Sequence, residues 1–596
     1  MLNWKDRLYC AGVSDVNLEL PVVLYGWVDT IRDHGHLLFI HLRDRSGIVQ
    51  LVIDPKVHAI AEKLRSEDVV EILGTVRKRT EDTINAQLKT GALEVVVTAI
   101  TRLTEADTPP FLITEKDASE PFHVDEELRL KYRYLDLRRP SMQQNLIKRY
   151  RLIKIIRDFL DEHGFIEVET PVLTKSTPEG ARDYLVPSRT HEGKFFALPQ
   201  SPQLFKQLLM VSGLDRYFQI VKCFRDEDLR PNRQPEFTQV DLEASFIDEE
   251  FIYQLLEALM IRLYAHEGVT LSAPFPRISY ADSMARFGND RPDIRFGMEL
   301  IDVTEVVRSV QYQIFQTILS KKGLIKGLTI KNAADKLSKN VMQEEIAKKV
   351  IPQMGAKGLT WMKVVDGKLD SNIVQFFSDA EQAALIAAMG AEEGDILTFI
   401  ADTNHGLVSD VLGRFRLYIA ERLGLLDSSV VAPCWVTDFP LYEKTENGLS
   451  SVHHPFTAPQ EDISLIKDAD ALLRVNAKAY DLVINGEEVG GGSIRIHDPK
   501  IQEKVFRDLG LSETDIQEKF GFFVNAFKFG TPPHGGLALG VDRLVSMILK
   551  KDSIREVIAF PKNRVAYCPL TQAPSDVAES QLKELKLEIK LLPKID

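Results

Sequence analysis

The sequence is poor in the features that mark secreted, disulfide-bonded or membrane-spanning proteins. Its four cysteines show no spacing typical of a zinc site or a disulfide framework: Cys10, Cys223, Cys434 and Cys568. Such usage favours a reducing cytoplasm. No apolar run is long enough to cross a bilayer. The N-terminus lacks a basic segment followed by an apolar core, so we expect no signal peptide. Internal repeats and low-complexity tracts are also lacking.

The bulk composition is that of a large globular protein. Its 596 residues indicate several domains, and 44% hydrophobic with 27% charged residues is ordinary. A net charge of −13 by itself favours an acidic enzyme without a nucleic-acid partner. Phosphates respond to local charge, however, and one segment is rich in cations: Lys131, Arg133, Arg138, Arg139, Lys148, Arg149 and Arg151.

The first part of the chain is typical of short strands. Apolar, β-rich segments at 22–28, 37–42, 48–53, 69–76 and 93–100 are separated by polar turns. This pattern predicts a small β-barrel over residues 1–106, with a sandwich fragment as the alternative. Three prolines then indicate a hinge at 107–138: Pro109, Pro110 and Pro121.

The remaining chain alternates helical and strand-like segments. A helix is expected to begin after Ser141 as its N-cap and to stop at Gly164. Residues 139–285 and 425–562 share a strand-rich character. The intervening 286–424 is rich in lysine and alanine and predicts an inserted α+β module. Residues 563–596 are a charged C-terminal extension.

Three motifs carry the chemistry. Phe224-Arg225-Asp226-Glu227 is followed by Glu236-Phe237, and Gly540-Val541-Asp542-Arg543 lies far downstream. Arginine binds phosphate bidentately and stays charged, so the two arginines would grip a triphosphate from both ends. A third segment, 164–171, ends in Pro171. These segments resemble motifs 2, 3 and 1 of the class II aminoacyl-tRNA synthetases.

Within that class, the order of parts resembles the bacterial-type aspartyl-tRNA synthetases. That resemblance implies an OB-fold barrel, an antiparallel class II core and a GAD-like insertion, in a multidomain α/β protein. It is carried by three further segments: Thr177–Asp183, Gln200–Lys206 and Gly490–His497. The implied reaction joins aspartate to the α-phosphate of ATP and then transfers the aspartyl group to tRNA. Neither step needs a protein nucleophile, because phosphoryl transfer depends on positioning and charge neutralisation.

The resemblance assigns residues to ATP and magnesium. Arg225 would bind the α-phosphate and the amino-acid carboxylate, Glu227 would help read the adenine, and Arg543 would hold the γ-phosphate. Gln234 and Gly540 complete the ATP set. Asp481 and Glu488 match the family's metal ligands, and Mg²⁺ prefers one or two carboxylates with phosphate oxygens.

The resemblance also assigns the amino-acid site. Arg495 and Lys206 would bind the side-chain carboxylate of aspartate, and Asp241 would face its ammonium group. The other assigned residues are Glu179, Gln203, Arg225 and His453. A lysine-specific relative would need an acid in place of Arg495, and the insertion argues against an asparagine-specific one.

Three patterns invite other interpretations. His453 and His454, taken as extended, would point to opposite faces and could not share a metal. Lys336-Leu337-Ser338-Lys339 is similar to a class I loop but is expected to be a solvated helix face. Gly490-Gly491-Gly492 lacks the lysine of a phosphate-binding loop, so it favours close approach of a ligand to a strand.

In the barrel, the resemblance assigns five residues to the anticodon: His34, Phe39, Gln50, Asp82 and Glu94. OB-folds stack aromatic side chains on splayed bases, although Phe39 could equally be core. In relatives that discriminate between aspartate and asparagine tRNAs, a leucine usually replaces His34 and a lysine lies near Asp82. This sequence therefore predicts charging of both tRNAs, by a cytoplasmic homodimer that dimerises around Pro171. The alternatives are a strictly discriminating enzyme or an RNA-binding regulatory protein with an inactive synthetase domain.

Overall fold

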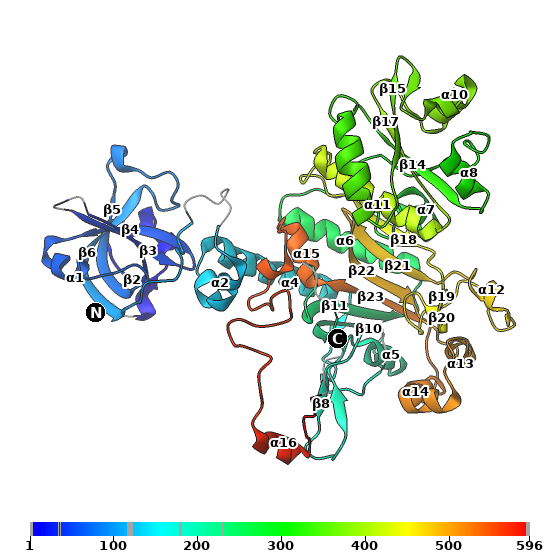
Figure 1. Cartoon of the computed structure of the whole chain (residues 1–596). Helices are drawn as coiled ribbons and strands as arrows, with labels where there is room; N and C mark the ends of the chain where they lie inside the picture. The colour runs from blue at the N-terminus through cyan, green and yellow to red at the C-terminus, as the bar shows by residue number, and fades with distance from the viewer. Residues whose placement is uncertain are drawn as a thin grey trace. The chain divides into compact units, whose positions relative to one another are not determined.

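A computed structural model describes residues 4–33, 35, 37–115, 123–177, 181–227 and 232–591. The chain forms two compact units (Figure 1). The first takes the described residues within Met1–Arg151, Leu229–Gln234 and Lys551–Val577. The second takes those within Leu152–Asp228, Pro235–Lys550 and Ala578–Asp596. No helix in the described ranges is long and apolar enough to cross a membrane.

The N-terminal part of the first unit is a closed β-barrel. Its strands are β1 (Arg7–Leu8), β2 (Pro21–Asp33), β3 (Leu38–Asp44), β4 (Gly47–Ile53), β5 (Val69–Lys78) and β6 (Leu93–Thr104). They pair in the order β1-β2-β3-β4-β6-β5, and β2 also pairs with β5 to close the barrel. Closure removes the exposed strand edges and encloses an apolar core. The OB-fold prediction is confirmed, and the sandwich alternative is wrong.

Three helices follow: α2 (Glu126–Lys131), α3 (Arg133–Asp136) and α4 (Pro140–Glu162). The expected N-cap of α4 is wrong, because the helix begins at Pro140, before Ser141. The carboxylate of Glu115 takes the capping role, accepting from Ser141 N at 3.0 Å and Ser141 Oγ at 2.5 Å. Proline suits this first position because it has no N–H to satisfy. The predicted stop at Gly164 is confirmed by its φ of +77°.

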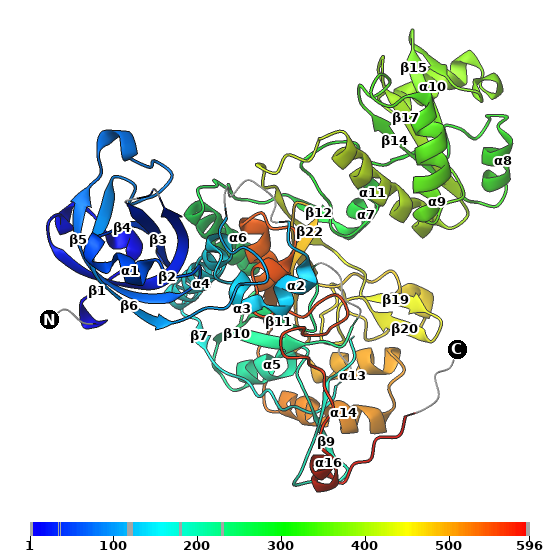
Figure 2. The ribbon, with the colours of Figure 1, turned by 60° about the vertical axis from the view of Figure 1, so that its left-hand side comes forward.

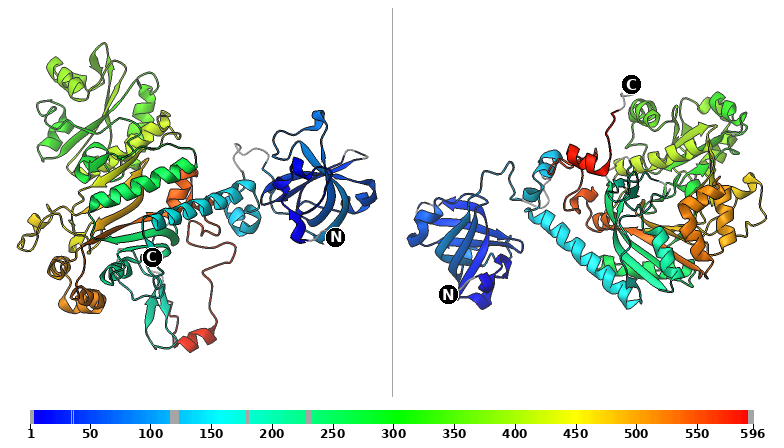
Figure 3. Two further views of the ribbon diagram at one scale, coloured as in Figure 1. Left: turned by 180° about the vertical axis from the view of Figure 1, so that it is seen from behind. Right: turned by 90° about the horizontal axis from the view of Figure 1, so that it is seen from below.

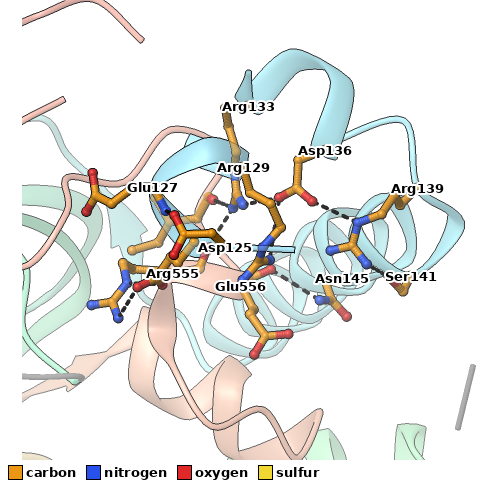
Figure 4. Close-up of polar contacts among 12 residues, drawn as sticks. Asp125, Glu127, Arg129, Arg133, Asp136, Arg139, Ser141, Asn145, Arg555 and Glu556 are labelled. Atoms are coloured by element: carbon orange, nitrogen blue, oxygen red, sulfur yellow. Dashed lines mark hydrogen bonds and ion pairs between the residues drawn. The ribbon is translucent and has the colours of Figure 1, made fainter. Parts of the chain in front are cut away.

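A buried polar network ties these helices to the segment after α15 (Val541–Ile548) within the first unit (Figure 4). Arg133 is 3% exposed and donates to the carbonyl oxygens of Arg555, Ile558 and Ala559 at 2.6–2.9 Å. Asp136, fully buried, accepts from Arg133 at 2.6 Å and from Arg139 at 2.7 Å. One carboxylate therefore compensates two buried guanidinium groups.

The second unit is built on an eight-stranded sheet with the order β12-β18-β21-β22-β23-β11-β10-β7. Its strands are β7 (Ile166–Glu167), β10 (Arg216–Phe224), β11 (Glu236–Ser245), β12 (Arg277–Ser279), β18 (Pro433–Thr437), β21 (Ala479–Ile484), β22 (Glu487–Ile494) and β23 (His534–Gly540). Only the two pairings with β7 and β12 are parallel. This confirms the predicted antiparallel core.

Helices cover both faces of this sheet (Figure 2). Helices α5 (Gln203–Val211), α13 (Pro499–Asp508) and α14 (Glu513–Phe527) gather on one side, and α6 (Glu249–His266) lies on the other (Figures 1 and 2). Helix α15 (Val541–Ile548) follows β23 directly. The first unit also contains the short helix α1 (His58–Ala61). Shorter elements of the second unit are α7 (Tyr280–Arg286), α9 (Ile351–Gln353), α12 (Ala469–Leu472), β19 (Tyr442–Thr445) and β20 (Gly448–Ser451).

A second sheet lies within the predicted insertion 286–424. It has the order β13-β14-β17-β15-β16, with β13 (Ile301–Asp302), β14 (Leu324–Ile330), β15 (Thr360–Val365), β16 (Lys368–Asp370) and β17 (Ile396–Asp402). Helices α8 (Gln313–Leu319), α10 (Asp379–Ala388) and α11 (His405–Arg422) accompany it. In the segment 336–339, expected to be a solvated helix face, three residues are exposed, but only Lys339 is helical and Leu337 is buried.

The C-terminal segment carries one short helix, α16 (Glu579–Leu585), the red helix of Figure 3. An ion pair joins Lys586 to Glu192, in the turn between β8 (Leu185–Pro187) and β9 (Phe195–Ala197). Exposed pairs of this kind contribute little to stability. The predicted domain boundaries stay predictions.

We predict that Asp136→Asn destabilises the protein by about 3–5 kcal/mol, because two buried guanidinium groups lose their shared counter-charge. The measurement is the temperature of unfolding by calorimetry. The matched control is Asp158→Asn, which removes an exposed pair with Lys154 on α4. An exposed pair is worth about 0–1 kcal/mol. Equal shifts for the two variants would contradict the prediction.

Candidate functional site

A polar pocket of about 510 Å³ lies on one face of the large sheet, inside the second unit. Its floor is a row of residues paired across four neighbouring strands: Asp241 with Ala538, Ala538 with Gly491, and Gly491 with Asp481. Residues paired in register point to the same face of a sheet. Strand pairing therefore brings two acidic side chains, distant in sequence, to opposite ends of one row.

The residues in the middle of that row must be small, because a larger side chain would collide with its neighbours. A Cβ on Gly491 would lie 2.3 Å from Asp481 Oδ1. In the neighbouring row, a Cβ on Gly536 would lie 2.0 Å from Glu243 Oε2. Within the glycine run, Gly491 and Gly492 line the pocket, whereas a Cβ on Gly490 would meet the Ala538 carbonyl at 2.5 Å. Close approach of a ligand to this strand stays a prediction.

Four charged side chains form a buried cluster at one end of the pocket. Lys206 Nζ donates to Asp241 Oδ1 at 2.8 Å and lies 3.3 Å from Glu243 Oε2. Arg495 grips Glu243 bidentately, at 2.9 Å from Nε and 3.1 Å from Nη2. All four are at most 2% exposed. Buried charges persist only when they are paired, so each depends on the others.

One acceptor in this cluster has no partner among the described residues. Asp241 Oδ2 is buried without a hydrogen-bond partner among those residues. The hydroxyl of Tyr217 donates to Gln219 at 3.0 Å. Burial raises the pKa of Asp241 to about 6, against the opposing effect of Lys206. The group is therefore mostly ionised at pH 7 and is a ready acceptor for a cationic ligand.

Arg495 holds a replaceable contact. Its Nη1 donates to Ser493 Oγ at 2.6 Å and approaches His454 Nε2 at 2.7 Å. His454 Nδ1 also accepts from Phe456 N at 3.2 Å. Burial and the charge of Arg495 hold the pKa of His454 well below its ordinary value, and a neutral imidazole has only one acceptor nitrogen. The contacts of His454 with Phe456 N and with Arg495 Nη1 therefore cannot both be full hydrogen bonds. An incoming carboxylate can take the place of His454 at Arg495.

The two histidines are not on opposite faces. His453 and His454 lie in a bend rather than an extended segment, and both line the pocket. Burial and then Arg495 lower the pKa of His453 to about 4, and its ring packs on Phe439 with centroids 4.5 Å apart. No group of three or more possible metal ligands occurs in the described parts of the chain.

Of the two arginines predicted to bind phosphate, one lines the pocket and the other does not. Arg225 lines the pocket, and its guanidinium lies over the Phe237 ring at 5.1 Å. Arg543 is outside the described lining, but its Nη1 donates to the Glu488 carbonyl. Gly540 is the N-cap of α15. The Nε atoms of Arg225 and Arg543 are buried and find no acceptor among the described residues.

Gln234 lies in the first unit, not with the pocket residues. Its side-chain amide makes two hydrogen bonds to the main chain of Lys562: Nε2 donates to the carbonyl at 3.0 Å, and Oε1 accepts from the N–H at 2.8 Å. Within the second unit, the Pro235 carbonyl accepts from Arg225 N at 2.9 Å.

Asp481 and Glu488 flank the turn between β21 and β22, as predicted. A β-bulge between Leu482 and Val483 shifts the register opposite Glu488, and bulges commonly re-aim side chains beside active sites. Burial raises the pKa of Asp481 well above its usual range, with Glu488 and Asp290 adding to the effect. Two adjacent hard-oxygen ligands that repel each other fit a divalent cation such as Mg²⁺.

In the barrel, the structure brings together three of the five predicted anticodon residues. Gln50 donates to Glu94 at 3.0 Å, and Phe39 points to the same face as Gln50 by strand register. Phe39 is half-buried and outside the barrel core, so the core interpretation is wrong. Asp82 is exposed in a short 3₁₀ helix. His34 and, in the pocket set, Glu179 lie outside the described residues.

Sequence reasoning missed Glu243, His454 and Asp290, all of which shape the pocket. Glu243 carried a usable signal, because it lies two residues after Asp241 in a strand and must share its face. Asp290 had none, since it follows α7 in the loop that leads into the insertion.

The family profile described as tRNA synthetases class II (D, K and N) matches residues 125–564. The chain belongs to this family. An OB-fold nucleic acid binding domain profile matches residues 22–103. Both findings agree with the motifs: the family of this synthetase implies ATP as a substrate, and the two matched domains support binding of tRNA.

Curated relatives cover the whole chain of the synthetase. Aspartate–tRNA(Asp/Asn) ligase 1 of Syntrophus aciditrophicus is 55% identical over 98% of this chain and 83% of its own length. Aspartate–tRNA ligase of Staphylococcus haemolyticus is 49% identical over 98% of this chain and 100% of its own length. The asparaginyl-tRNA synthetase of Pyrococcus horikoshii, solved with asparaginyl-adenylate, is 21% identical with a TM-score of 0.56 over 93% of this chain and 97% of that chain. That likeness shows the fold alone.

We predict that Gly491→Ala lowers kcat/KM for amino-acid activation at least roughly 100-fold, because its Cβ would displace the Asp481 carboxylate and an error of 1 Å costs about that much. The measurement is steady-state activation kinetics on folded protein. Gly358→Ala is the control, since no atom lies within 4 Å of a Cβ at that position. Wild-type kinetics in Gly491→Ala would remove Asp481 from the reaction.

Proposed function

We propose that this chain is an aspartate–tRNA ligase, which activates L-aspartate with ATP and transfers the aspartyl group to tRNA. One observation carries the proposal: an acidic oxygen, Asp241 Oδ2, has no partner among the described residues and lies buried in a cluster that also holds Arg495 and Lys206. This arrangement complements an ammonium group and an acidic side chain on one small molecule. The names of the relatives support the same substrate.

Aspartate would bind by completing the buried cluster. Its ammonium donates to Asp241 Oδ2, and its side-chain carboxylate takes the Arg495 Nη1 contact now made with His454. Glu243 keeps the guanidinium oriented throughout, because its bidentate contact involves the other two nitrogens. Gln203 Nε2, a buried donor with no partner among the described residues, is available to the α-carboxylate. Neutral His453 and His454 line the cavity without adding positive charge.

Activation then follows from position and charge. The aspartate α-carboxylate attacks the α-phosphorus of ATP, forming a new P–O bond as the bond to pyrophosphate breaks. Arg225 neutralises charge at the reacting phosphate, and Arg543 binds the far end of the triphosphate. Glu227 contributes to binding of the nucleotide. Asp481 and Glu488 would hold Mg²⁺, which when bound supplies charge neutralisation to the phosphate oxygens.

Transfer completes the reaction. A ribose hydroxyl of the tRNA attacks the aspartyl carbonyl, and AMP leaves. The barrel contributes binding energy by stacking a base on Phe39 and hydrogen-bonding at Gln50 and Glu94. Stacking on one base is worth roughly 1–3 kcal/mol.

The proposal includes a cytoplasmic homodimer. Large apolar side chains near the first motif are about half exposed: Ile166 51%, Val172 49% and Leu173 51%. A second copy covering this patch would remove it from water. The experiment is the molar mass of the full chain by light scattering.

The regulatory alternative is disfavoured by the arrangement of the pocket. A domain that only binds RNA has no need for a buried cluster of four charges, which is costly to maintain unless all members are present. Aspartate-dependent exchange of pyrophosphate into ATP separates the two functions, because an inactive domain does not support it.

We predict aspartate-dependent ATP–pyrophosphate exchange in the wild type. In Arg495→Leu the exchange should fall by about 10⁴ or more, because the side-chain carboxylate of aspartate would lose its charged partner in the site. ATP binding, followed by calorimetry, should change little. The control is Arg507→Leu on α13, whose guanidinium is exposed and pairs with Glu503 and Glu513. Normal exchange in Arg495→Leu would remove this residue from the amino-acid site.

We predict charging of both aspartate and asparagine tRNAs, at rates within about tenfold, or about 1.4 kcal/mol. An imidazole at His34 can donate to or accept from either anticodon base, whereas a leucine leaves a polar edge unmatched at about 1–3 kcal/mol. His34→Leu should therefore lower charging of the asparagine tRNA more, and His58→Leu on α1 is the control. A rate on the asparagine tRNA of only about 1% would contradict the prediction.

A further inference from the structure

The loop 287–298 joins the large sheet to the inserted module and reaches the pocket. We call it the connecting loop. Asp290, on this loop, lines the pocket together with Asp481 and Glu488. Its neighbour Arg291 lies with Nη1 4.0 Å from Glu487 Oε2, on the strand that carries Glu488. The connecting loop thus lies against the hairpin that carries the two predicted metal ligands.

One buried arginine of the insertion binds the connecting loop. Arg416, on α11, is 1% exposed. Its Nε donates to the Met298 carbonyl at 3.0 Å, and its Nη2 approaches the carbonyls of Asp293, Phe296 and Gly297 at 2.8–2.9 Å. Its guanidinium also lies 4.0 Å from the centre of the Phe296 ring. A planar group with fixed donors fits such an array, which a lysine could not satisfy.

The main chains of α11 and the connecting loop are also in close contact. A Cβ on Gly288 would lie 2.1 Å from the Ser409 carbonyl, and one on Gly413 would lie 2.7 Å from the Phe287 carbonyl. On its other side, the loop meets the turn between β21 and β22, where a Cβ on Gly486 would lie 3.1 Å from Asp293 Cβ. The connecting loop is therefore held between helix α11 and the hairpin of Asp481 and Glu488.

We propose that the connecting loop is part of the Mg·ATP site, with Asp290 as an outer carboxylate and Arg416 as the positioning residue that holds it there. This inference rests on the proposed function. It gives the insertion a definite role in catalysis, because helix α11 fixes the loop that brings a third negative charge to the metal carboxylates.

Asp290 acts through metal-bound water rather than as a direct ligand. The described residues contain no group of three acidic, histidine or cysteine side chains close enough to hold one ion. Mg²⁺ keeps several waters when it binds protein, and these waters need acceptors. Outer-shell partners of this kind typically change metal affinity roughly 10–100-fold.

The first test measures metal binding directly. Mn²⁺ is titrated into the full-length protein in the presence of a non-hydrolysable ATP analogue, and free Mn²⁺ is followed by electron paramagnetic resonance. Asp290→Asn should weaken Mn²⁺ binding roughly 10-fold. The control, Asp379→Asn in the first turn of α10, should leave it unchanged. Unchanged binding in Asp290→Asn would overturn the role of this residue.

The second test separates positioning from stability. Arg416→Lys keeps the charge but loses the array of carbonyl contacts; Arg414→Lys, at an exposed position on the same helix, is its control. For folded Arg416→Lys, KM for ATP and the Mg²⁺ requirement should rise roughly 10-fold while KM for aspartate stays within about twofold. A purely structural role would lower the unfolding temperature and leave these constants unchanged, which would overturn the proposal.

Different results would contradict the proposed function and the role of the connecting loop. A wild-type protein without aspartate-dependent exchange would contradict the proposed function. A wild-type protein with normal exchange, beside Asp290→Asn and Arg416→Lys variants with unaltered metal dependence, would contradict only this inference.

Discussion

The pairing of buried charges is the constraint on which the site depends. Lys206, Asp241, Glu243 and Arg495 are almost fully removed from water, and each would be costly to bury alone. Their formal charges sum to zero, so the cluster is stable as a unit. It is nevertheless incomplete, because Asp241 Oδ2 has no partner among the described residues. A ligand that brings the ammonium group and the side-chain carboxylate of an acidic amino acid can join the cluster and leave its net charge unchanged.

The sheet determines where these charges lie. Cross-strand pairing places Asp241, Ala538, Gly491 and Asp481 in one row, so the proposed amino-acid end and the proposed metal end of the pocket share a rigid floor. Glycine and alanine in the row leave the volume that side chains would otherwise fill. Because the floor is built from strands rather than loops, the separation of the two ends is fixed by backbone hydrogen bonds.

Both units use a buried arginine to hold irregular main chain. In the first unit Arg133 binds three carbonyl groups of the segment after α15, and in the second Arg416 binds four of the connecting loop. Carbonyl groups in such segments lack partners from regular secondary structure, and each unsatisfied one is costly. A guanidinium satisfies several at once, so single side chains fix these segments.

The sequence by itself determined the barrel, the antiparallel core, the family and many of the residues that line the pocket, because these follow from local periodicity and from motifs that are short and contiguous. It also indicated Asp481 and Glu488 as a pair, since one turn separates their strands. It could not place Gln234 against Lys562, assign Glu115 as the cap of α4, or bring His453 and His454 to one side. Nor did any local pattern connect Arg416 to the connecting loop and Asp290 to the pocket. Those relations join residues far apart in the chain, and only the packing of the folded strands, helices and loops decides them.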